Sequence, residues 1–168
     1  IASSAMNEGL FVKQSEVHGM SQRGGAVLAN LRLSDQPIAS DLIPEGSAQM
    51  ILSMEPMESL RYVKYLSESG TLIASNPVTN ISNYPDLESI LSAIRELPHS
   101  VIVDSEKLAR EAGSARASNM VIVGAASHHL PVRESTIEAL IGEMFARKGE
   151  KVVDINLKAF RLGREHGQ

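Results

Sequence analysis

The segment from Ser15 to Gly25, Ser-Glu-Val-His-Gly-Met-Ser-Gln-Arg-Gly-Gly, holds the densest group of reactive side chains in the chain. It combines a carboxylate, an imidazole, an amide, a guanidinium and several glycines. Glycine lets backbone amides approach a ligand or another chain closely, and the Arg23 guanidinium can bind a carboxylate or phosphate through two parallel hydrogen bonds. A solvated connection between two strands is the alternative interpretation. The candidate site residues are Glu16, His18, Gly19, Met20, Ser21, Gln22, Arg23, Gly24 and Gly25.

A hydrolase triad of Glu16, His18 and Ser21 is disfavoured. All three residues lie on one short loop, whereas triads are usually assembled from distant elements. The Gly-x-Ser-x-Gly turn that presents a nucleophilic serine is also absent. The segment therefore does not predict a self-contained hydrolytic site.

The histidines outside this segment do not predict a metal site. His128 and His129 are adjacent, and neighbouring side chains on a helix point about 100° apart. The carboxyl end of a helix, which favours a protonated imidazole, explains at least one of them. His99 and His166 are expected at the surface.

Glu55 is the secondary candidate because it follows an apolar strand and precedes a helix. This is the carboxyl edge at which open α/β sheets place their ligands. The alternative, favoured by the residue physics alone, is an acid held by the positive start of that helix. Met54, Met57 and Met144 are interpreted as core-filling residues.

Short strands flank the segment from Ser15 to Gly25, called the reactive segment below. Residues 10–13 and 27–33 have strand character, with a polar loop between them. Residues 1–8 have the pattern of the second half of a helix that closes at Gly9. The reactive segment is thus expected on a loop between two strands.

The middle of the chain predicts a βαβ unit with a right-handed crossover. A continuous apolar strand at 49–54 is followed by a helical pattern that opens at Pro56 and closes at Gly70. Residues 71–75 form the next strand. The expected apolar face of the helix consists of Met57, Leu60, Val63 and Leu66.

The following segments alternate in the same way. Residues 76–86 are rich in proline and asparagine and predict a loop. An amphipathic helix is expected at 87–97, a buried strand at 100–104, and a helix at 107–112 that ends at Gly113.

Residues 120–130 are ambiguous, because their β-branched start suits a strand. Their length and the run Gly124-Ala125-Ala126, which lets another element approach closely, favour a buried helix. The chain is predicted to be α/β: a three-layer α/β/α, Rossmann-like arrangement with a mostly parallel or mixed sheet flanked by helices.

The last part of the sequence predicts two more helices. Ser135 and Glu138 have the spacing of a capping box, and Gly149 is the expected stop of the helix they begin. A final helix is expected after Asn156. The apolar face of the first of these helices consists of Ile137, Leu140, Ile141, Met144 and Phe145.

Composition excludes several classes of function. The 168 residues include 16 basic and 20 acidic side chains, a net charge of −4, so the usual driving force for nucleic-acid binding is absent. No cysteine is present to form a disulfide, a thiolate nucleophile or a cluster ligand. No apolar run approaches the about 20 residues needed to cross a bilayer. A single soluble, cytoplasmic domain without nucleic-acid or membrane partners is expected.

The segment 15–25 resembles the signature loop of the beta subunits of indolepyruvate ferredoxin oxidoreductases. These are the gamma-type subunits or domains of the 2-oxoacid:ferredoxin oxidoreductases. The resemblance extends over essentially the whole chain. Further similar segments are Glu55-Pro56-Met57-Glu58-Ser59-Leu60-Arg61-Tyr62, Tyr84-Pro85-Asp86-Leu87, Ala112-Gly113-Ser114, Asn119-Met120, Gly124-Ala125 and Asn156-Leu157-Lys158-Ala159-Phe160-Arg161-Leu162-Gly163.

The resemblance implies one gamma-type domain at 1–168. The family pattern begins with a strand and a Gly-x-Gly-Gly-Gln-Gly turn, neither of which is in this sequence, so both are expected upstream of Ile1. Without that strand, two strand edges would be exposed.

The resemblance also implies an activity that is shared with a larger alpha subunit. The complex would decarboxylate an aryl 2-oxoacid such as indolepyruvate, pass the electrons to ferredoxin and release the acyl group on coenzyme A. Thiamine diphosphate and iron–sulfur clusters would belong mainly to the alpha subunit. This chain alone is expected to bind no cofactor and no metal and to be inactive, and to work in a hetero-oligomer with Glu16–Gly25 facing the partner.

Two other classes of function remain open. One is the gamma subunit of a pyruvate or 2-oxoglutarate ferredoxin oxidoreductase, and another is a non-catalytic scaffold or regulatory module. A stand-alone Rossmann-type enzyme would need its own phosphate-binding glycine turn and acidic residue, which the sequence does not show.

Overall fold

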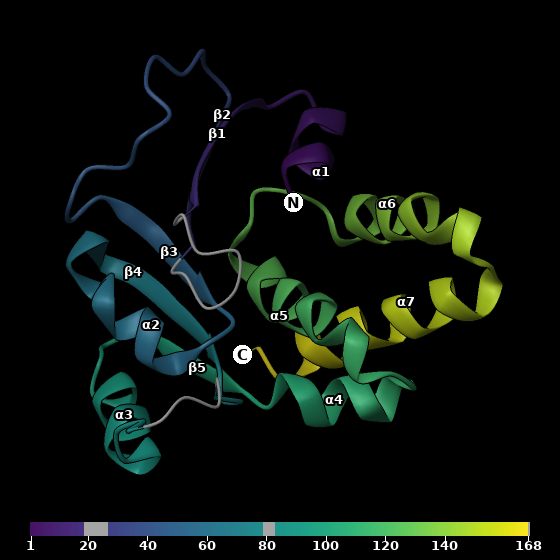
Figure 1. The fold of residues 1–168 in the computed structure, drawn as a ribbon. Helices are drawn as coiled ribbons and strands as arrows, with labels where there is room; N and C mark the ends of the chain where they lie inside the picture. The colour runs from purple at the N-terminus through teal and green to yellow at the C-terminus, as the bar shows by residue number, and fades with distance from the viewer. Residues whose placement is uncertain (19–26, 79–82, 168) are drawn as a thin grey trace.

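The computed structural model describes residues 1–18, 27–78 and 83–167, and these form an α/β fold (Figure 1). The described elements, in chain order, are α1 (Ala2–Asn7), β1 (Phe11–His18), β2 (Val27–Ser34), β3 (Ala48–Ser53), α2 (Pro56–Arg61), η1 (Val63–Tyr65), β4 (Leu66–Ser75), α3 (Leu87–Arg95), β5 (Ser100–Val103), α4 (Ser105–Ala112), η2 (Ala115–Ala117), α5 (Ser118–Ala126), η3 (Ser127–His129), α6 (Glu134–Phe145), η4 (Ala146–Lys148) and α7 (Glu150–Glu165).

The centre of the molecule is a parallel sheet with the strand order β3-β4-β5. Leu72 of β4 lies opposite Ile51 of β3 and Ser100 of β5. The chain passes through α2 between β3 and β4, and through α3 between β4 and β5. Both helices cover the same face of the sheet, so the two crossovers have the same hand, as tandem βαβ units do.

Helices cover both faces of this sheet. Leu72 and Ala74 of β4 pack with Ile90 and Ile94 of α3 on one face. Ile73, which lies between them in the sequence, packs on the opposite face with α4 and α5. Successive side chains of a strand point to opposite faces, and a strand covered on both sides is apolar throughout. The predicted three-layer α/β/α arrangement is confirmed.

The β1–β2 pair forms a separate antiparallel sheet, rather than part of the central one, among the residues that the structure describes. It runs from the pair Phe11–Ser34 to the pair His18–Val27. Val12 and Leu33 pack against a cluster that includes Ala5 of α1 and residues of α6 and α7. The hairpin is therefore joined to the body through α1 and the C-terminal helices.

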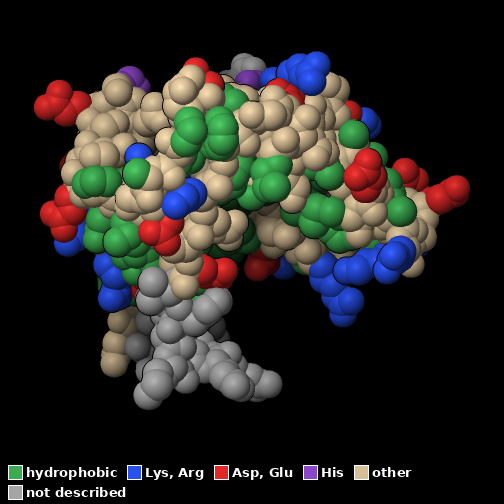
Figure 2. Space-filling view, turned by 90° about the horizontal axis from the view of Figure 1, so that it is seen from above, with side chains coloured by type: hydrophobic (Ala, Val, Ile, Leu, Met, Phe, Trp, Pro, Cys, Tyr) green, Lys and Arg blue, Asp and Glu red, His purple; other side chains and the backbone are tan. Residues whose placement is uncertain are grey.

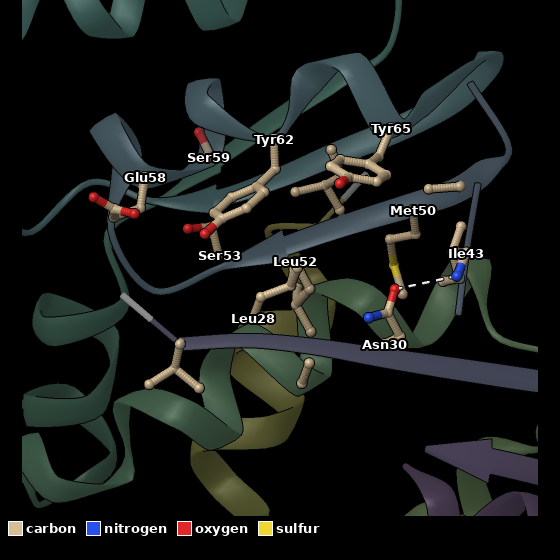
Figure 3. A pocket seen from close by; sticks show the side chains of 14 residues that line it. Leu28, Asn30, Ile43, Met50, Leu52, Ser53, Glu58, Ser59, Tyr62 and Tyr65 are labelled. Atoms are coloured by element: carbon tan, nitrogen blue, oxygen red, sulfur yellow. Dashed lines mark hydrogen bonds between the residues drawn. The ribbon is translucent and has the colours of Figure 1, made fainter. Parts of the chain in front are cut away.

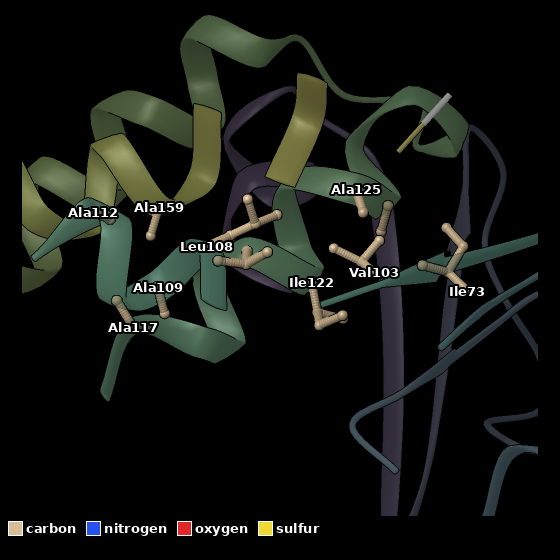
Figure 4. Packing of buried hydrophobic residues seen from close by; sticks show 11 residues of the cluster. Ile73, Val103, Leu108, Ala109, Ala112, Ala117, Ile122, Ala125 and Ala159 are labelled. Carbon is tan, nitrogen blue, oxygen red and sulfur yellow. The ribbon is translucent and has the colours of Figure 1, made fainter. Parts of the chain in front are cut away.

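The expected buried helix at 120–130 is confirmed as α5, which ends at Ala126 and packs in the core beneath the sheet (Figure 4). Glycine at Gly124 is required by the approach of α7, because a Cβ atom there would overlap the carbonyl oxygen of Phe160. At Gly163 on α7 a Cβ atom would similarly overlap the carbonyl oxygen of Val121. The two glycines allow the two backbones to touch.

The prediction of one long helix from Pro56 to Gly70 is wrong. The helix α2 ends at Arg61, the 3₁₀ turn η1 follows, and β4 already begins at Leu66. Gly70 lies inside β4, where a Cβ atom would be 2.6 Å from the carbonyl oxygen of Ala48. This glycine therefore permits close contact between neighbouring strands instead of ending a helix.

The starts of the last two helices also differ from the prediction. The capping box is absent, because α6 begins at Glu134 and its N-cap Arg133 makes no side-chain cap. Glu138 instead forms an ion pair with Arg161 of α7, with Oε1 2.6 Å from Nε. The final helix begins at Glu150, and Asn156 lies within it, where its side chain donates to the Val152 carbonyl at 2.7 Å.

Two of the three methionines assigned to the core are exposed. Met54 is 47% exposed and Met144 is 65% exposed, whereas Met57 packs with the α2–α3 side of the sheet. Met54 follows the last residue of β3 and Met144 lies on the outer side of α6, so neither position is covered by another element. The apolar character of a methionine did not decide its burial.

One face of the molecule carries charged side chains of both signs (Figure 2). Figure 2 shows acidic and basic side chains interspersed around hydrophobic ones on that face. No helix within the described ranges is long and apolar enough to cross a membrane.

Candidate functional site

The hairpin determines where the reactive segment begins and ends. Glu16 and His18 belong to β1 rather than to a loop, and His18 is paired with Val27 at the start of β2. Glu16 is exposed and lies opposite Ala29. The connection from 19 to 26 lies outside the described residues. With it lie Gly19, Met20, Ser21, Gln22, Arg23, Gly24 and Gly25, whose roles remain predictions.

Glu55 lies at the carboxyl edge of the central sheet, directly before α2, as predicted. Its extended backbone makes it the N-cap of α2, and its carboxylate Oε2 accepts a hydrogen bond of 2.7 Å from the Glu58 amide. The Ser53 hydroxyl donates to the Glu55 carbonyl at 2.7 Å. The interpretation of Glu55 as an acid held by a helix start is therefore confirmed.

Tyr84 is a further member of this site that the residue types alone did not indicate. Its hydroxyl donates to Oε1 of Glu55, so the two oxygens of one carboxylate hold two different segments. Burial and the hydrogen bond with Glu55 raise the pKa of Tyr84 from 10.0 to about 12. The phenol therefore remains a hydrogen-bond donor throughout the physiological pH range.

This contact joins two of the segments that carry the family resemblance, the one that begins at Glu55 and the one that begins at Tyr84. Tyr84-Pro85-Asp86 precedes α3, and the Asp86 carboxylate caps that helix by accepting from the Ser89 amide at 2.9 Å. Glu55 caps α2 in the same way. The Glu55–Tyr84 hydrogen bond thus ties the beginnings of both crossover helices together at the carboxyl edge of the sheet, where α/β proteins bind ligands.

A cleft of about 240 Å³ separates β2 from β3 (Figure 3). Leu28 of β2 lies across from Leu52 of β3, and Tyr62 and Tyr65 lie above them on the side of α2 and η1. The two tyrosine rings are 6.3 Å apart between centroids, tilted by 41°. The remaining lining residues are Val27, Ala29, Asn30, Ile43, Ala48, Met50, Ile51, Ser53, Glu58 and Ser59.

Two polar groups line this cleft at different places. Asn30 is buried, and its Oδ1 accepts a hydrogen bond of 3.3 Å from the Ile43 amide. Glu58 pairs through Oε1 with Arg61 at 3.2 Å, whereas its Oε2 is buried without a hydrogen-bond partner in the described structure. The cleft is otherwise mainly apolar, which suits an apolar occupant more than a charged one.

The histidines do not form a metal site in the part of the chain that the structure describes. The Nε2 atom of His128 is 2.8 Å from the carbonyl oxygen of Arg164, and both His128 and His129 lie in the turn η3 after α5. His99 and His166 are exposed, as expected. No group of three or more His, Asp or Glu side chains there can hold a metal ion.

These residues do not fit the cofactors that the resemblance implies for the complex. The chain has no cysteine with which to bind an iron–sulfur cluster. Within the described ranges, no cluster of three or more His, Asp or Glu side chains is placed to hold a metal ion. The described part of the site orients the starts of α2 and α3 and lines a mainly apolar cleft.

The chain is similar to proteins of one family along almost its whole length. Residues 1–166 match the family described as pyruvate ferredoxin/flavodoxin oxidoreductase. The chain is 36% identical to the indolepyruvate oxidoreductase subunit IorB of Archaeoglobus fulgidus, over 97% of this chain and 84% of that protein. It is also 36% identical to the subunit of the same name from Pyrococcus horikoshii, over 95% of this chain and 83% of that protein.

Solved structures have the same fold. The pyruvate oxidoreductase subunit PORC of Thermotoga maritima superposes with a TM-score of 0.71 at 24% identity, covering 98% of this chain and 84% of that one. A 2-oxoglutarate:ferredoxin oxidoreductase from Magnetococcus marinus gives a TM-score of 0.76 at 20% identity. The superposed region is 99% of this chain and 27% of that longer polypeptide. With its α/β fold and a family match from end to end, the chain belongs to the pyruvate ferredoxin/flavodoxin oxidoreductase family.

Proposed function

We propose that this chain is the small, gamma-type subunit of an indolepyruvate ferredoxin oxidoreductase. In the complex, an aryl 2-oxoacid such as indolepyruvate is decarboxylated, the electrons pass to ferredoxin and the acyl group leaves on coenzyme A. The subunit completes and supports the reaction site that it shares with a larger alpha subunit, and it is inactive alone. We further propose a cytoplasmic location, which suits a chain without cysteine.

One observation carries the choice of substrate. Identity to four indolepyruvate oxidoreductase subunits is 34–36% over nearly the whole chain. Identity to pyruvate and ketoisovalerate oxidoreductases is lower, at 23–28% over comparable parts of this chain. Indolepyruvate is therefore the first substrate to test, ahead of pyruvate and 2-oxoglutarate.

The cofactors are assigned to the alpha subunit. Because these 168 residues contain no cysteine, the iron–sulfur clusters need thiolates from outside them, and we assign those thiolates to the alpha subunit. Thiamine diphosphate, when bound in the complex, supplies the chemistry that cleaves the bond next to the oxo group. The hetero-oligomer is thus a requirement of the proposed reaction, and nucleic acids and membranes are not among its partners.

The residues Glu16–Gly25 are proposed to face the alpha subunit. In this proposal Arg23 pairs with an anion of the partner or of a ligand, while His18 and Gln22 form hydrogen bonds across the contact. Support comes from the hairpin, whose paired strands end at His18 and Val27, so that both ends of this segment lie together at one end of the hairpin. A charge pair buried at such a contact is costly to break from one side.

The activity is tested with the tagged chain co-expressed with its candidate alpha subunit. The purified complex is supplied with coenzyme A, a viologen dye and, in parallel, indolepyruvate, pyruvate or 2-oxoglutarate. We expect dye reduction with indolepyruvate in the complex and none with the isolated chain. Co-purification of a thiamine-containing partner without activity on any of the three acids would reject the substrate, and absence of co-purification would favour a scaffold or regulatory module.

The interface is tested by Arg23→Ala in the same complex. We expect activity or assembly to fall at least about tenfold, because removing one member of a buried charge pair leaves the other unpaired. The helical circular dichroism of the isolated chain is expected to stay unchanged. Arg147→Ala, an exposed arginine in η4, is the matched control. Normal assembly and turnover of Arg23→Ala would leave the segment as a connection only.

A further inference from the structure

The carboxyl edge of the central sheet is where the hairpin and the strands β3 and β4 come together. Leu28 of β2 lies beside Leu52 of β3, and along the cleft the residue numbers of the two strands run in opposite directions (Figure 3). The first residue of β2, Val27, therefore lies near the end of β3, where Val27 and Ser53 both line the cleft. The paired residues His18 and Val27, between which the connection 19–26 runs in the sequence, thus lie beside this edge.

Apolar side chains are exposed to water at this edge. Met54 directly follows β3 and is 47% exposed, and Val78 follows β4 and is 42% exposed. The two strands are neighbours, with Ser53 opposite Ala74. Val27 is 57% exposed beside them. Exposed apolar side chains that gather in one place, with polar residues around them, are typical of a surface that binds another protein.

The helix starts at this edge do not favour a phosphate or carboxylate ligand. A free helix N-terminus binds such anions through its amides. Here the carboxylates of Glu55, Asp86 and Asp104 cap α2, α3 and α4, and each accepts a hydrogen bond from a first-turn amide, at 2.7, 2.9 and 3.0 Å respectively. A capping carboxylate occupies the amide and repels a second anion. The described edge is therefore suited to a protein surface rather than to a phosphate group.

The same capping carboxylates give the edge a negative charge. The first turns of the three helices also contain Glu58, Glu88 and Glu106, but these pair with arginines further along the same helices. None of the ion pairs in the described part of the chain includes a capping carboxylate, although Lys107 in the first turn of α4 offsets part of their charge. A partner surface that fits this edge therefore has lysine or arginine side chains around an apolar centre.

We propose that this edge is a docking surface for the alpha subunit, formed by Met54 and Val78 with the three capping carboxylates around them, and we call it the docking edge. It rests on the proposed function, because the residues 16–25 beside this edge are proposed to face the same subunit. Continuity with those residues identifies the partner, and the apolar and negative character of the edge specifies the chemistry of the partner's surface. The contact thus extends from the hairpin onto the central sheet, next to the hydrogen bond between Tyr84 and Glu55.

Met54→Lys tests the docking edge in the complex. The tagged variant is co-expressed with the candidate alpha subunit, and the molar ratio of the two subunits is measured after purification. We expect at least about tenfold less alpha subunit than with the wild-type chain, because the lysine brings a charge into the apolar centre and repels a basic partner surface. Urea unfolding of the isolated chain should be unchanged, since Met54 is already exposed.

Met144→Lys is the matched control. Met144 is 65% exposed on α6, which packs against α1 and α7 away from the central sheet (Figure 1). This variant should capture as much alpha subunit as the wild-type chain does. Met54→Glu tests the charge of the partner surface, and it should capture more alpha subunit than Met54→Lys because a glutamate attracts basic side chains. The reverse order of capture would contradict a basic partner surface and overturn the proposal.

The outcomes separate the docking edge from the proposed function. If the wild-type chain captures the alpha subunit and Met54→Lys captures as much of it as Met144→Lys does, the docking edge is refuted and the subunit assignment stands. If the wild-type chain captures no alpha subunit, the proposed function fails and the docking edge fails with it. A loss of capture confined to the Met54 variants, with unchanged urea unfolding, supports the docking edge.

Discussion

At the residue scale, the carboxylate of Glu55 connects two parts of the chain. One oxygen caps α2 through the Glu58 amide, and the other accepts the hydrogen bond from Tyr84 in the segment before α3. Hydrogen bonds to a charged group are stronger than neutral ones. A single side chain therefore fixes the helix start and the neighbouring connection at the edge of the sheet.

Replacing Tyr84 by Phe tests this connection through pH. Because its pKa is raised from 10.0 to about 12 in the folded state, Tyr84 contributes stability that is fully present below pH 10 and is lost as the pH rises to about 12. The free energy of unfolding in urea should be about 1–2 kcal/mol lower for Tyr84→Phe at pH 8. The difference from wild type should shrink between pH 10 and 12.

Ultraviolet absorbance provides the control for that measurement. The chain contains three tyrosines, and the wild-type absorbance curve should show one phenol that titrates near pH 12. That titration step should be absent from the curve of Tyr84→Phe. Tyr62→Phe, at the cleft, should retain it. A wild-type curve without a phenol near pH 12 would contradict the hydrogen bond between Tyr84 and Glu55.

Of the two residues in this contact, Glu55 could be predicted from the sequence and Tyr84 could not. Glu55 could be located because its position between an apolar strand and Pro56 is a local pattern. Tyr84 could not, since its partner is 29 residues away and the two meet only after the chain has formed β4. The residues Gly19–Gly25 were selected by their composition and by the family resemblance, and their roles remain predictions.

At the element scale, the contact between α5 and α7 depends on two glycines. Each lies where the backbone of the other helix leaves no room for a Cβ atom, at Gly124 against Phe160 and at Gly163 against Val121. Glycine inside a helix ordinarily costs about 0.5–1 kcal/mol relative to alanine. Here the close approach of the helices and the burial of Ala125 and Ala159 between them offset that cost.

Gly124→Ala should therefore destabilise the fold although alanine is the better helix former. The added methyl group overlaps backbone atoms of α7, and we expect unfolding in urea to lose about 1–3 kcal/mol. Gly142→Ala in α6 is the matched control, because a Cβ atom there meets nothing within 4 Å. It should gain up to about 1 kcal/mol from helix propensity. Equal effects of the two substitutions would refute the close contact.

Helices and strands could be predicted where a local sequence pattern determines them. They could not be predicted where tertiary packing determines the conformation. The strand at 100–103 and the helix that ends before Gly113 follow from apolar runs and a glycine stop. The long helix at 56–70 was wrong because Leu66 fits a helical repeat equally well as a strand, and sheet pairing with Ala48 decides its conformation.

At the scale of the whole molecule, Glu8 joins the N-terminal unit to the C-terminal helices. It follows α1, and its carboxylate accepts a hydrogen bond of 2.9 Å from the Arg133 amide at the start of α6. This long-range contact takes the place of the local capping box that Ser135 and Glu138 were expected to form. The cap comes from a residue 125 positions away, which no local pattern reveals.

Acid should therefore weaken the contact between Glu8 and the start of α6 before it destabilises the parallel sheet. Hydrogen bonds from the Thr136 side chain and the Arg133 amide lower the pKa of Glu8 from 4.5. A lowered folded-state pKa contributes stability that is present above pH 4.5 and is lost as the pH falls through the folded value. The urea midpoint of wild type should exceed that of Glu8→Gln at pH 7, and the two midpoints should converge as the pH falls below 4.5.

Hydrogen exchange of the backbone amides shows which part of the molecule loses stability in Glu8→Gln. In Glu8→Gln at pH 7, amides of α1 and of the first turn of α6 should exchange faster, while those of 72–75 in β4 should not change, because separate apolar clusters hold the two regions. Glu143→Gln, on the exposed side of α6, removes the same charge without this contact and is the control. If the midpoints of wild type and Glu8→Gln diverge as the pH falls, the carboxylate is not what joins α1 to α6.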